Sequence, residues 1–166
     1  MEEAIVEVEA FREENGYASV DYNIEIKSKP AWDNKLQPEP TEVVRLIYKE
    51  LQGLDILDRI KIFAFDERVL NALHEVDSTV TQVYLISENK PDVSANLAKL
   101  THLPDVYAPS YALVDSNLTE EIHDKGMRLI PWTVNNYEDI IRLVDLGVDG
   151  IISDYPNYFE KIRKLR

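Results

Sequence analysis

The stretch SVDYNIEIKSKP contains the residue types with the clearest chemical potential in this chain. Asn23, Glu25 and Lys27 alternate with isoleucines, so an extended backbone would place the three polar side chains on one face. A carboxylate that points inward near a strand end must be solvated, paired or bound to a metal ion, because an isolated buried charge is very costly. Lys27 could pair with Glu25 or bind a phosphate oxygen. A plain Glu–Lys pair on a solvated edge strand would show the same pattern, and both interpretations stay open.

The segment IPWTVNN, residues 130–136, is a second candidate site. Trp132 would supply an aromatic wall at the end of a strand, and the alternating residues Thr133 and Asn135 would supply hydrogen-bonding groups. A core aromatic residue followed by an asparagine that caps the next helix would also fit this segment.

Residues for proton transfer are scarce. His74, His102 and His123 fall in predicted helices or loops, away from the carboxyl ends of the predicted strands, and we expect them at the surface. The chain has no cysteine, and it contains no nucleophile elbow, glycine-rich phosphate loop or two-histidine metal motif. Hydrolysis at a metal-bound site usually needs a proton donor for the leaving group, so this shortage matters.

Hydrophobic periodicity predicts the elements that must position these residues. Short strands alternate with amphipathic helices, which indicates parallel pairing through crossover helices in a single domain over residues 1–166. The predicted strands cover residues 20–27, 59–65, 81–86, 105–111, 128–134 and 150–154. The predicted helices cover residues 2–15, 42–52, 66–76, 93–100, 118–126, 137–147 and 157–165.

Polar residues gather where these strands end, at the edge where α/β sheets bind their ligands. A doubly wound sheet and a barrel both satisfy this pattern. Six βα units would complete a doubly wound sheet, but they would leave an eight-unit barrel incomplete.

Charge narrows the choice of ligand. The net charge is −13, with 31 acidic against 18 basic residues, so the positive face that a nucleic-acid binder needs is missing. An anionic small molecule would also be repelled, unless a metal ion reverses the local field. The apolar runs are too short to span a bilayer, and Met1 is followed by two glutamates rather than by a signal peptide.

Four segments taken together resemble the glycerophosphodiester phosphodiesterase family: VDYNIEIKSKP, FAFDERVLNALHEV, RLIPWTVNN and LGVDGIISDYP. The resemblance runs over almost the whole chain. It implies a (β/α)8 TIM barrel that hydrolyses glycerophosphodiesters to an alcohol and glycerol 3-phosphate with a divalent metal, Mg or Ca. It also implies that Glu25 is a metal ligand and that Lys27 is a catalytic residue beside the phosphate. Trp132 would line the substrate cleft, and Asn23 and Asn135 would bind substrate.

The chain departs from the family pattern in one important respect. The family's His-Arg-Gly segment, Glu-x-Asp pair and His-Asp pair, which supply its histidines and further metal carboxylates, are absent here. We therefore expect an incomplete barrel of six parallel strands, family strands 3–8, without two βα units of about 30 residues each. Ala64 is a smaller departure, at a position where the family commonly has serine. Because Mg or Ca takes about six oxygen ligands, one glutamate would not hold it, and we expect this chain alone to be inactive.

Two interpretations follow from this resemblance. Either the chain is part of a glycerophosphodiester phosphodiesterase, or it is a non-catalytic, degenerate barrel that binds a phosphodiester or a protein partner. Open sheet edges invite association, so we expect a homo-oligomer or a complex with the missing N-terminal segment. The preferred head group and the cellular compartment stay open, since an export signal could precede that segment.

Overall fold

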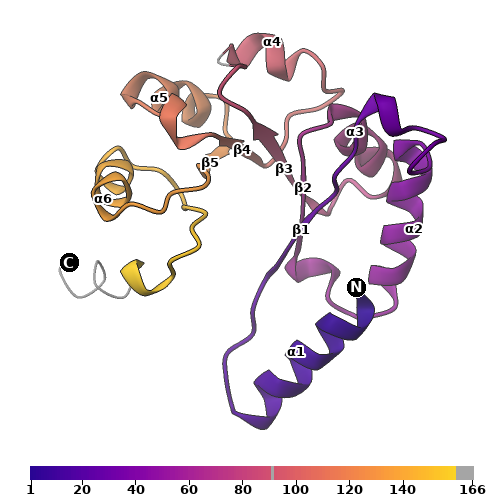
Figure 1. Cartoon of the computed structure of the whole chain (residues 1–166). Coiled ribbons are helices and arrows are strands. Elements are labelled where there is room, and N and C mark those ends of the chain that lie inside the picture. The colour runs from indigo at the N-terminus through magenta and orange to yellow at the C-terminus, as the bar shows by residue number, and fades with distance from the viewer. Residues whose placement is uncertain (91, 160–166) are drawn as a thin grey trace. The chain divides into compact units, whose positions relative to one another are not determined.

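The computed structural model describes residues 1–90 and 92–159. The chain divides into two compact units, Met1–Thr81 and Gln82–Arg166, and each is described by itself (Figure 1). The single domain predicted over residues 1–166 stays a prediction.

The first unit contains two parallel strands and three helices. Strands β1 and β2 pair with Asn23 opposite Lys61 and Glu25 opposite Phe63. Helix α2 begins with a proline at its first position, where the missing N–H costs nothing, and α3 is capped by the carboxylate of Asp66. The bounds are α1 Glu2–Glu14, β1 Tyr22–Glu25, α2 Pro40–Gln52, β2 Ile60–Ala64 and α3 Glu67–Val76, with short 3-10 turns at Pro30–Trp32 and Leu57–Arg59.

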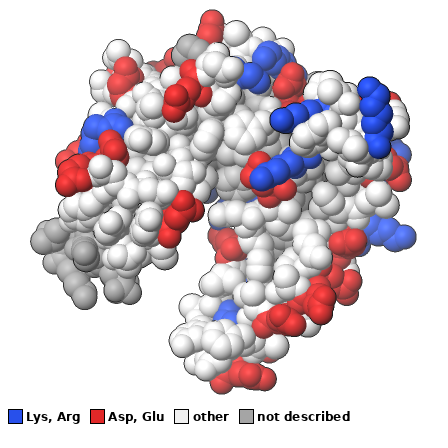
Figure 2. Space-filling view, viewed as in Figure 1, with Lys and Arg blue, Asp and Glu red and all other residues white. Residues whose placement is uncertain are grey.

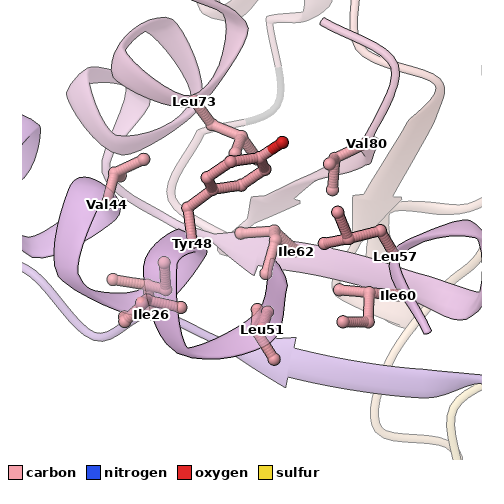
Figure 3. A pocket seen from close by; sticks show the side chains of 10 residues that line it. Ile26, Val44, Tyr48, Leu51, Leu57, Ile60, Ile62, Leu73 and Val80 are labelled. Carbon is pink, nitrogen blue, oxygen red and sulfur yellow. The ribbon is translucent and has the colours of Figure 1, made fainter. Parts of the chain in front are cut away.

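The core of this unit lies where α2 and α3 cover the two strands. Figure 3 shows side chains of α2 and α3 directed toward isoleucines of β2, around a small apolar pocket. The one polar atom on its labelled side chains, the Tyr48 hydroxyl, donates to the Asp77 carboxylate at 2.7 Å. Because the pocket offers no other group to orient a ligand, it is part of the packing and not a binding site. Its lining residues are Ile26, Val44, Ile47, Tyr48, Leu51, Leu57, Ile60, Ile62, Leu73 and Val80.

The second unit repeats the strand–helix order. Strands β3, β4 and β5 are parallel, with β4 between the other two. The buried rings of Tyr84 and Tyr107 meet edge to face, with their centroids 6.4 Å apart. The bounds are β3 Thr81–Ile86, α4 Val93–Leu97, β4 Val106–Pro109, α5 Ser116–Asp124, β5 Arg128–Leu129 and α6 Tyr137–Asp145, with a 3-10 turn at Tyr111–Leu113.

Five of the six predicted strands form, and the prediction for residues 150–154 is wrong. This segment runs beside the continuation of β5, where Val134 donates to the Ile152 carbonyl at 2.9 Å and Ile152 donates to the Pro131 carbonyl at 3.0 Å. Pro131 has no N–H to donate to this segment, so no regular ladder forms there. On the other side of β5, Pro109 of β4 has no N–H to donate to Ile130, so β5 stops at Leu129.

The ends of the other elements follow the prediction within a few residues. The predicted last helix, 157–165, is helical at residues 157–159, and its remainder lies outside the described residues. None of the described helices is long and apolar enough to cross a bilayer.

Candidate active-site edge

The carboxyl end of β1 has the alternation that its sequence predicts. Asn23, Glu25 and Lys27 are exposed, whereas Ile26 is 5% exposed and lines the apolar pocket under α2. The polar side chains therefore lie on the strand face that α2 does not cover. In a barrel with its helices outside, that face is the interior.

Lys27 is held from both sides. The Ile26 N–H donates to the Phe63 carbonyl of β2 at 2.8 Å. On the other side, the Ser28 hydroxyl donates to the Asp66 carboxylate at 2.8 Å, and Ser28 is only 9% exposed. The backbone of Lys27 is thus fixed between two anchors, while its side chain reaches solvent.

Asp66, which follows β2, is the centre of a polar network. Its carboxylate accepts hydrogen bonds from Ser28 and from the backbone and guanidinium of Arg68. Burial raises the pKa of Asp66, but the hydrogen bonds from Arg68 and Ser28 outweigh it, so this pKa lies below its usual value. The hydrogen bonds that Arg68 donates to Asp66 and Asp33 in turn raise the pKa of Arg68, so the pair is ionised.

In the second unit, Trp132 lies across the end of β4. Its indole N–H donates to the Ala108 carbonyl at 2.7 Å, and its backbone forms a bridge with Ser110. The half-buried indole is therefore fixed in orientation, as a cleft wall must be.

Asn135 makes structural contacts as well. Its amide NH2 donates to the Asp154 carboxylate at 2.7 Å, and its carbonyl accepts from the Asp154 N–H at 2.9 Å. These bonds tie two loops together, so the role of Asn135 in substrate binding stays a prediction.

Glu88 is a polar residue at this edge that the sequence analysis missed. It follows β3, and its carboxylate accepts a hydrogen bond of 2.9 Å from the hydroxyl of Ser110, which is 4% exposed. The run Ser87-Glu88-Asn89 directly after a buried strand was the available signal.

The structure thus brings the predicted site residues together in two sets. Asn23, Glu25 and Lys27 share one strand face in the first unit, and Trp132 and Asn135 share one segment in the second. The convergence of the two sets on one substrate stays a prediction.

The residues present do not fit a closed Mg or Ca site. Within residues 1–90 and 92–159, no group of three or more Asp, Glu, His or Cys side chains is placed to hold a metal ion. Glu25 supplies one carboxylate at the end of β1, and Asp66 is engaged by Ser28 and Arg68. These divalent cations take six or more oxygens, usually from more than one carboxylate.

The histidines add no proton donor to either set. His123 is exposed and contacts the Asp149 carboxylate at 2.9 Å, whereas His74 and His102 are half-buried rather than fully at the surface. His102 contacts the Gln82 side chain at 2.9 Å. His102 precedes β4 and Asp149 precedes the segment 150–154, so both lie toward the edge opposite the candidate site.

Parallel strands, crossover helices and polar residues at the strands' carboxyl ends are the design of barrel-type α/β enzymes. The sequence profile of the glycerophosphoryl diester phosphodiesterase family matches residues 2–158, and the chain belongs to this family. The predicted fold class, an incomplete (β/α)8 barrel, is confirmed by the parallel strands and by similar solved structures.

Known relatives agree with this assignment. The glycerophosphodiester phosphodiesterase of Bacillus subtilis (strain 168) is 32% identical over 110 residues, which are 64% of this chain and 37% of that protein. A candidate glycerophosphoryl diester phosphodiesterase of Silicibacter pomeroyi DSS-3 has 25% identity and a TM-score of 0.72, over 86% of this chain and 50% of its own. An Oleispira antarctica phosphodiesterase, solved with the product sn-glycerol-3-phosphate, has 16% identity and a TM-score of 0.72, over 87% of this chain and 55% of its own. This chain therefore spans 37% of the Bacillus subtilis protein and about half of each of these two solved structures.

Proposed function

We propose that this chain supplies the substrate-binding part of a metal-dependent glycerophosphodiester phosphodiesterase, which releases an alcohol and glycerol 3-phosphate. The observation that carries the proposal is the exposed Lys27, held between two anchors beside Glu25 at the carboxyl end of β1. Family membership supports it, as does the product bound to the Oleispira antarctica relative.

Each site residue then has a defined task. The Lys27 ammonium binds a phosphate oxygen, because a cation whose backbone is already ordered loses little entropy on binding. Trp132 provides an apolar wall for the glycerol carbons, and Asn23 and Asn135 donate hydrogen bonds to the substrate. Glu25 would supply one oxygen ligand to a divalent metal in a complete enzyme. The further ligands and the proton-transfer groups would have to come from elsewhere than the described residues, where no group of three or more Asp, Glu, His or Cys is placed to hold a metal ion.

A non-catalytic role is the second candidate, and the lack of a three-ligand cluster among the described residues favours it. In that case the same Lys27 edge binds a phosphodiester or its phosphate product without turnover. Both candidates predict that the isolated chain binds glycerol 3-phosphate and lacks diesterase activity.

Calorimetry with sn-glycerol 3-phosphate tests the shared prediction. Lys27→Met should weaken binding about 10-fold or more, because it removes a charge-assisted contact with phosphate. Lys49→Met, at an exposed position of helix α2, is the matched control and should bind as the wild type does. Absence of binding, or equal binding by both variants, would contradict the proposal.

An activity assay separates the two candidates. The isolated chain with Mg or Ca should not hydrolyse glycerophosphocholine, and turnover above about 1 s⁻¹ would contradict this expectation. Addition of the first two βα units of a complete family member should restore turnover if the chain is part of an enzyme. It should have no effect if the chain is a binding module.

Helix α1 supplies a surface for such an added segment. Its positions 4, 8 and 11 form an apolar stripe, on which Val8 is 43% and Phe11 is 60% exposed, and Ile5 is the helix's buried residue. We propose that βα units of the same fold cover this stripe. The double variant Val8→Lys, Phe11→Lys should abolish complementation. Sedimentation of the wild type as a dimer that this variant dissolves would instead assign the stripe to a second copy.

A further inference from the structure

The segment between β1 and α2, residues 26–39, carries Lys27, is tied at two points to the start of α3 and has one further hydrogen bond within itself. Ser28 donates to Asp66 at 2.8 Å, and Gln37 donates to the Ser28 hydroxyl at 2.9 Å. The second tie to α3 is the Asp33 carboxylate, which accepts from Arg68 at 2.5 Å. We call this segment the β1–α2 loop. Figure 2 shows basic side chains gathered over this part of the molecule, whereas acidic ones line α1.

Arg68 contacts both the β1–α2 loop, through Asp33, and the start of α3, through Asp66. Its guanidinium donates two hydrogen bonds to Asp66, from Nε at 3.0 Å and from Nη2 at 2.7 Å, and it also contacts Asp33. Arginine is suited to this position, because its planar fork can hold two carboxylates in fixed geometry and a lysine cannot.

A continuous path of contacts joins Arg68 to Lys27. Arg68 orients the Asp66 carboxylate, which accepts from Ser28, and Ser28 is the next residue after Lys27. The Asp66 side chain is 4% exposed, so water does not readily replace a lost partner.

We infer that Arg68 is a positioning residue that sets the direction of Lys27 for a phosphate group, although it touches no substrate. The inference rests on the proposed function of Lys27. It adds that the affinity for the glycerol 3-phosphate part of a substrate depends on a residue 41 positions further along the chain (68 − 27 = 41).

The physical reason is the entropy of the loop. Without Arg68, the β1–α2 loop loses its direct tie at Asp33 and the orienting partner of Asp66. A ligand must then order Lys27 and its neighbours as it binds, at a cost that corresponds to an affinity loss of about 5- to 10-fold.

Arg59 provides a matched control at the opposite end of β2. Its guanidinium also binds one carboxylate through two nitrogens, with distances of 2.9 and 3.0 Å to Glu9. It also contacts the Val20 carbonyl and the Tyr22 ring, and all of these partners lie outside the β1–α2 loop. Loss of Arg59 should therefore affect stability and leave phosphate binding unchanged.

The experiment compares Arg68→Met, Arg68→Lys and Arg59→Met in calorimetry with sn-glycerol 3-phosphate. Arg68→Met should weaken binding about 5- to 10-fold, and Arg59→Met by less than about 2-fold, even where both lower the melting temperature. Arg68→Lys should recover part of the melting temperature but not the affinity, since lysine keeps the charge and loses the fork. Equal affinities for the two methionine variants would overturn the inference.

A double-mutant cycle distinguishes positioning from general damage. In a Lys27→Met background, Arg68→Met should cause little further loss, because the group that it positions is already gone. Independent, additive losses would overturn the inference. If Lys27→Met leaves binding unchanged, the proposed function of Lys27 fails instead.

Amide hydrogen exchange of the ligand-free chain supplies a measurement that needs no binding. Arg68→Met should accelerate exchange at residues 27–37 relative to the wild type, and Arg59→Met should not. Unchanged exchange in this loop would refute the positioning role even if no phosphate compound binds.

Discussion

The two ends of strand β2 use the same chemistry for different purposes. Arg59 precedes the strand and binds Glu9, which also accepts a hydrogen bond of 2.5 Å from the Tyr22 hydroxyl. Arg68 follows the strand and binds Asp66, which also accepts one of 2.8 Å from the Ser28 hydroxyl. Each end thus has an arginine, a carboxylate and a hydroxyl donor.

The difference lies in burial and in what is held. The Glu9 side chain is 20% exposed and ties helix α1 to the strands, whereas the Asp66 side chain is 4% exposed and ties down the loop that carries Lys27. An ion pair near water contributes little, while a buried carboxylate depends on its partners. We conclude that the amino end of β2 attaches a helix, and the carboxyl end preserves the geometry of the candidate site.

Removal of the buried carboxylate should have the largest effect. Asp66→Ala deletes the cap of α3 and leaves Arg68 and Ser28 without their common acceptor. Because Arg68 is 36% exposed, we expect the low end of the range for a broken buried pair, about 3 kcal/mol of unfolding free energy. Urea denaturation measures it, and a loss below about 1 kcal/mol would show that water replaces the network.

Paired hydroxyl deletions sharpen the comparison. Ser28→Ala removes a donor to a buried carboxylate and should lower the unfolding free energy by about 1.5 kcal/mol. Tyr22→Phe removes the matching donor to the more exposed Glu9 and should have a smaller effect. Urea denaturation of both variants under the same conditions shows which one loses more unfolding free energy. A larger loss for Tyr22→Phe would mean that the amino end of β2 depends more on its hydrogen bonds than the carboxyl end does.

Lowering the pH should remove the stability that the Glu9 network gives to the amino end of β2, over a defined range of pH. The hydrogen bonds from Arg59 and then Tyr22 lower the pKa of Glu9 from 4.5 to about 2. A lowered pKa gives stability that is complete above the unfolded value of 4.5 and is lost as pH falls toward 2. Between pH 2 and 6, the unfolding free energy of Glu9→Gln should fall less steeply with decreasing pH than that of the wild type. Identical pH dependence in both proteins would contradict the lowered pKa of Glu9.

An exposed pair should have the smallest effect. Asp21 pairs with Lys61 across the amino ends of the strands, and the Asp21 side chain is 55% exposed. Asp21→Asn should change the unfolding free energy by less than about 0.5 kcal/mol, the usual size for a surface pair. It serves as the control for Asp66→Ala, and a larger change would show that this edge is not solvated.

Much of the molecule is predictable from residue order, because periodicity and turn residues act over a few neighbours. The strands and helices follow from such local patterns, and so does the alternation that exposes Glu25 and Lys27 and buries Ile26. The sixth strand failed for a reason outside its own segment, because Pro131 of the neighbouring segment lacks the N–H that a regular ladder needs.

The hydrogen-bond networks of the side chains could not be predicted from local sequence patterns. Ser28 and Asp66 are 38 residues apart, and Arg68 and Asp33 are 35 apart, so no spacing rule connects them. The asparagine cap predicted for this segment is confirmed at Asn136, which caps α6. The partner of Asn135 could not be predicted, since it is Asp154, 19 residues away. Local sequence sets which residues can reach a strand's edge, whereas the folded chain selects their partners, since hydrogen bonds depend on distance in space and not on separation along the chain.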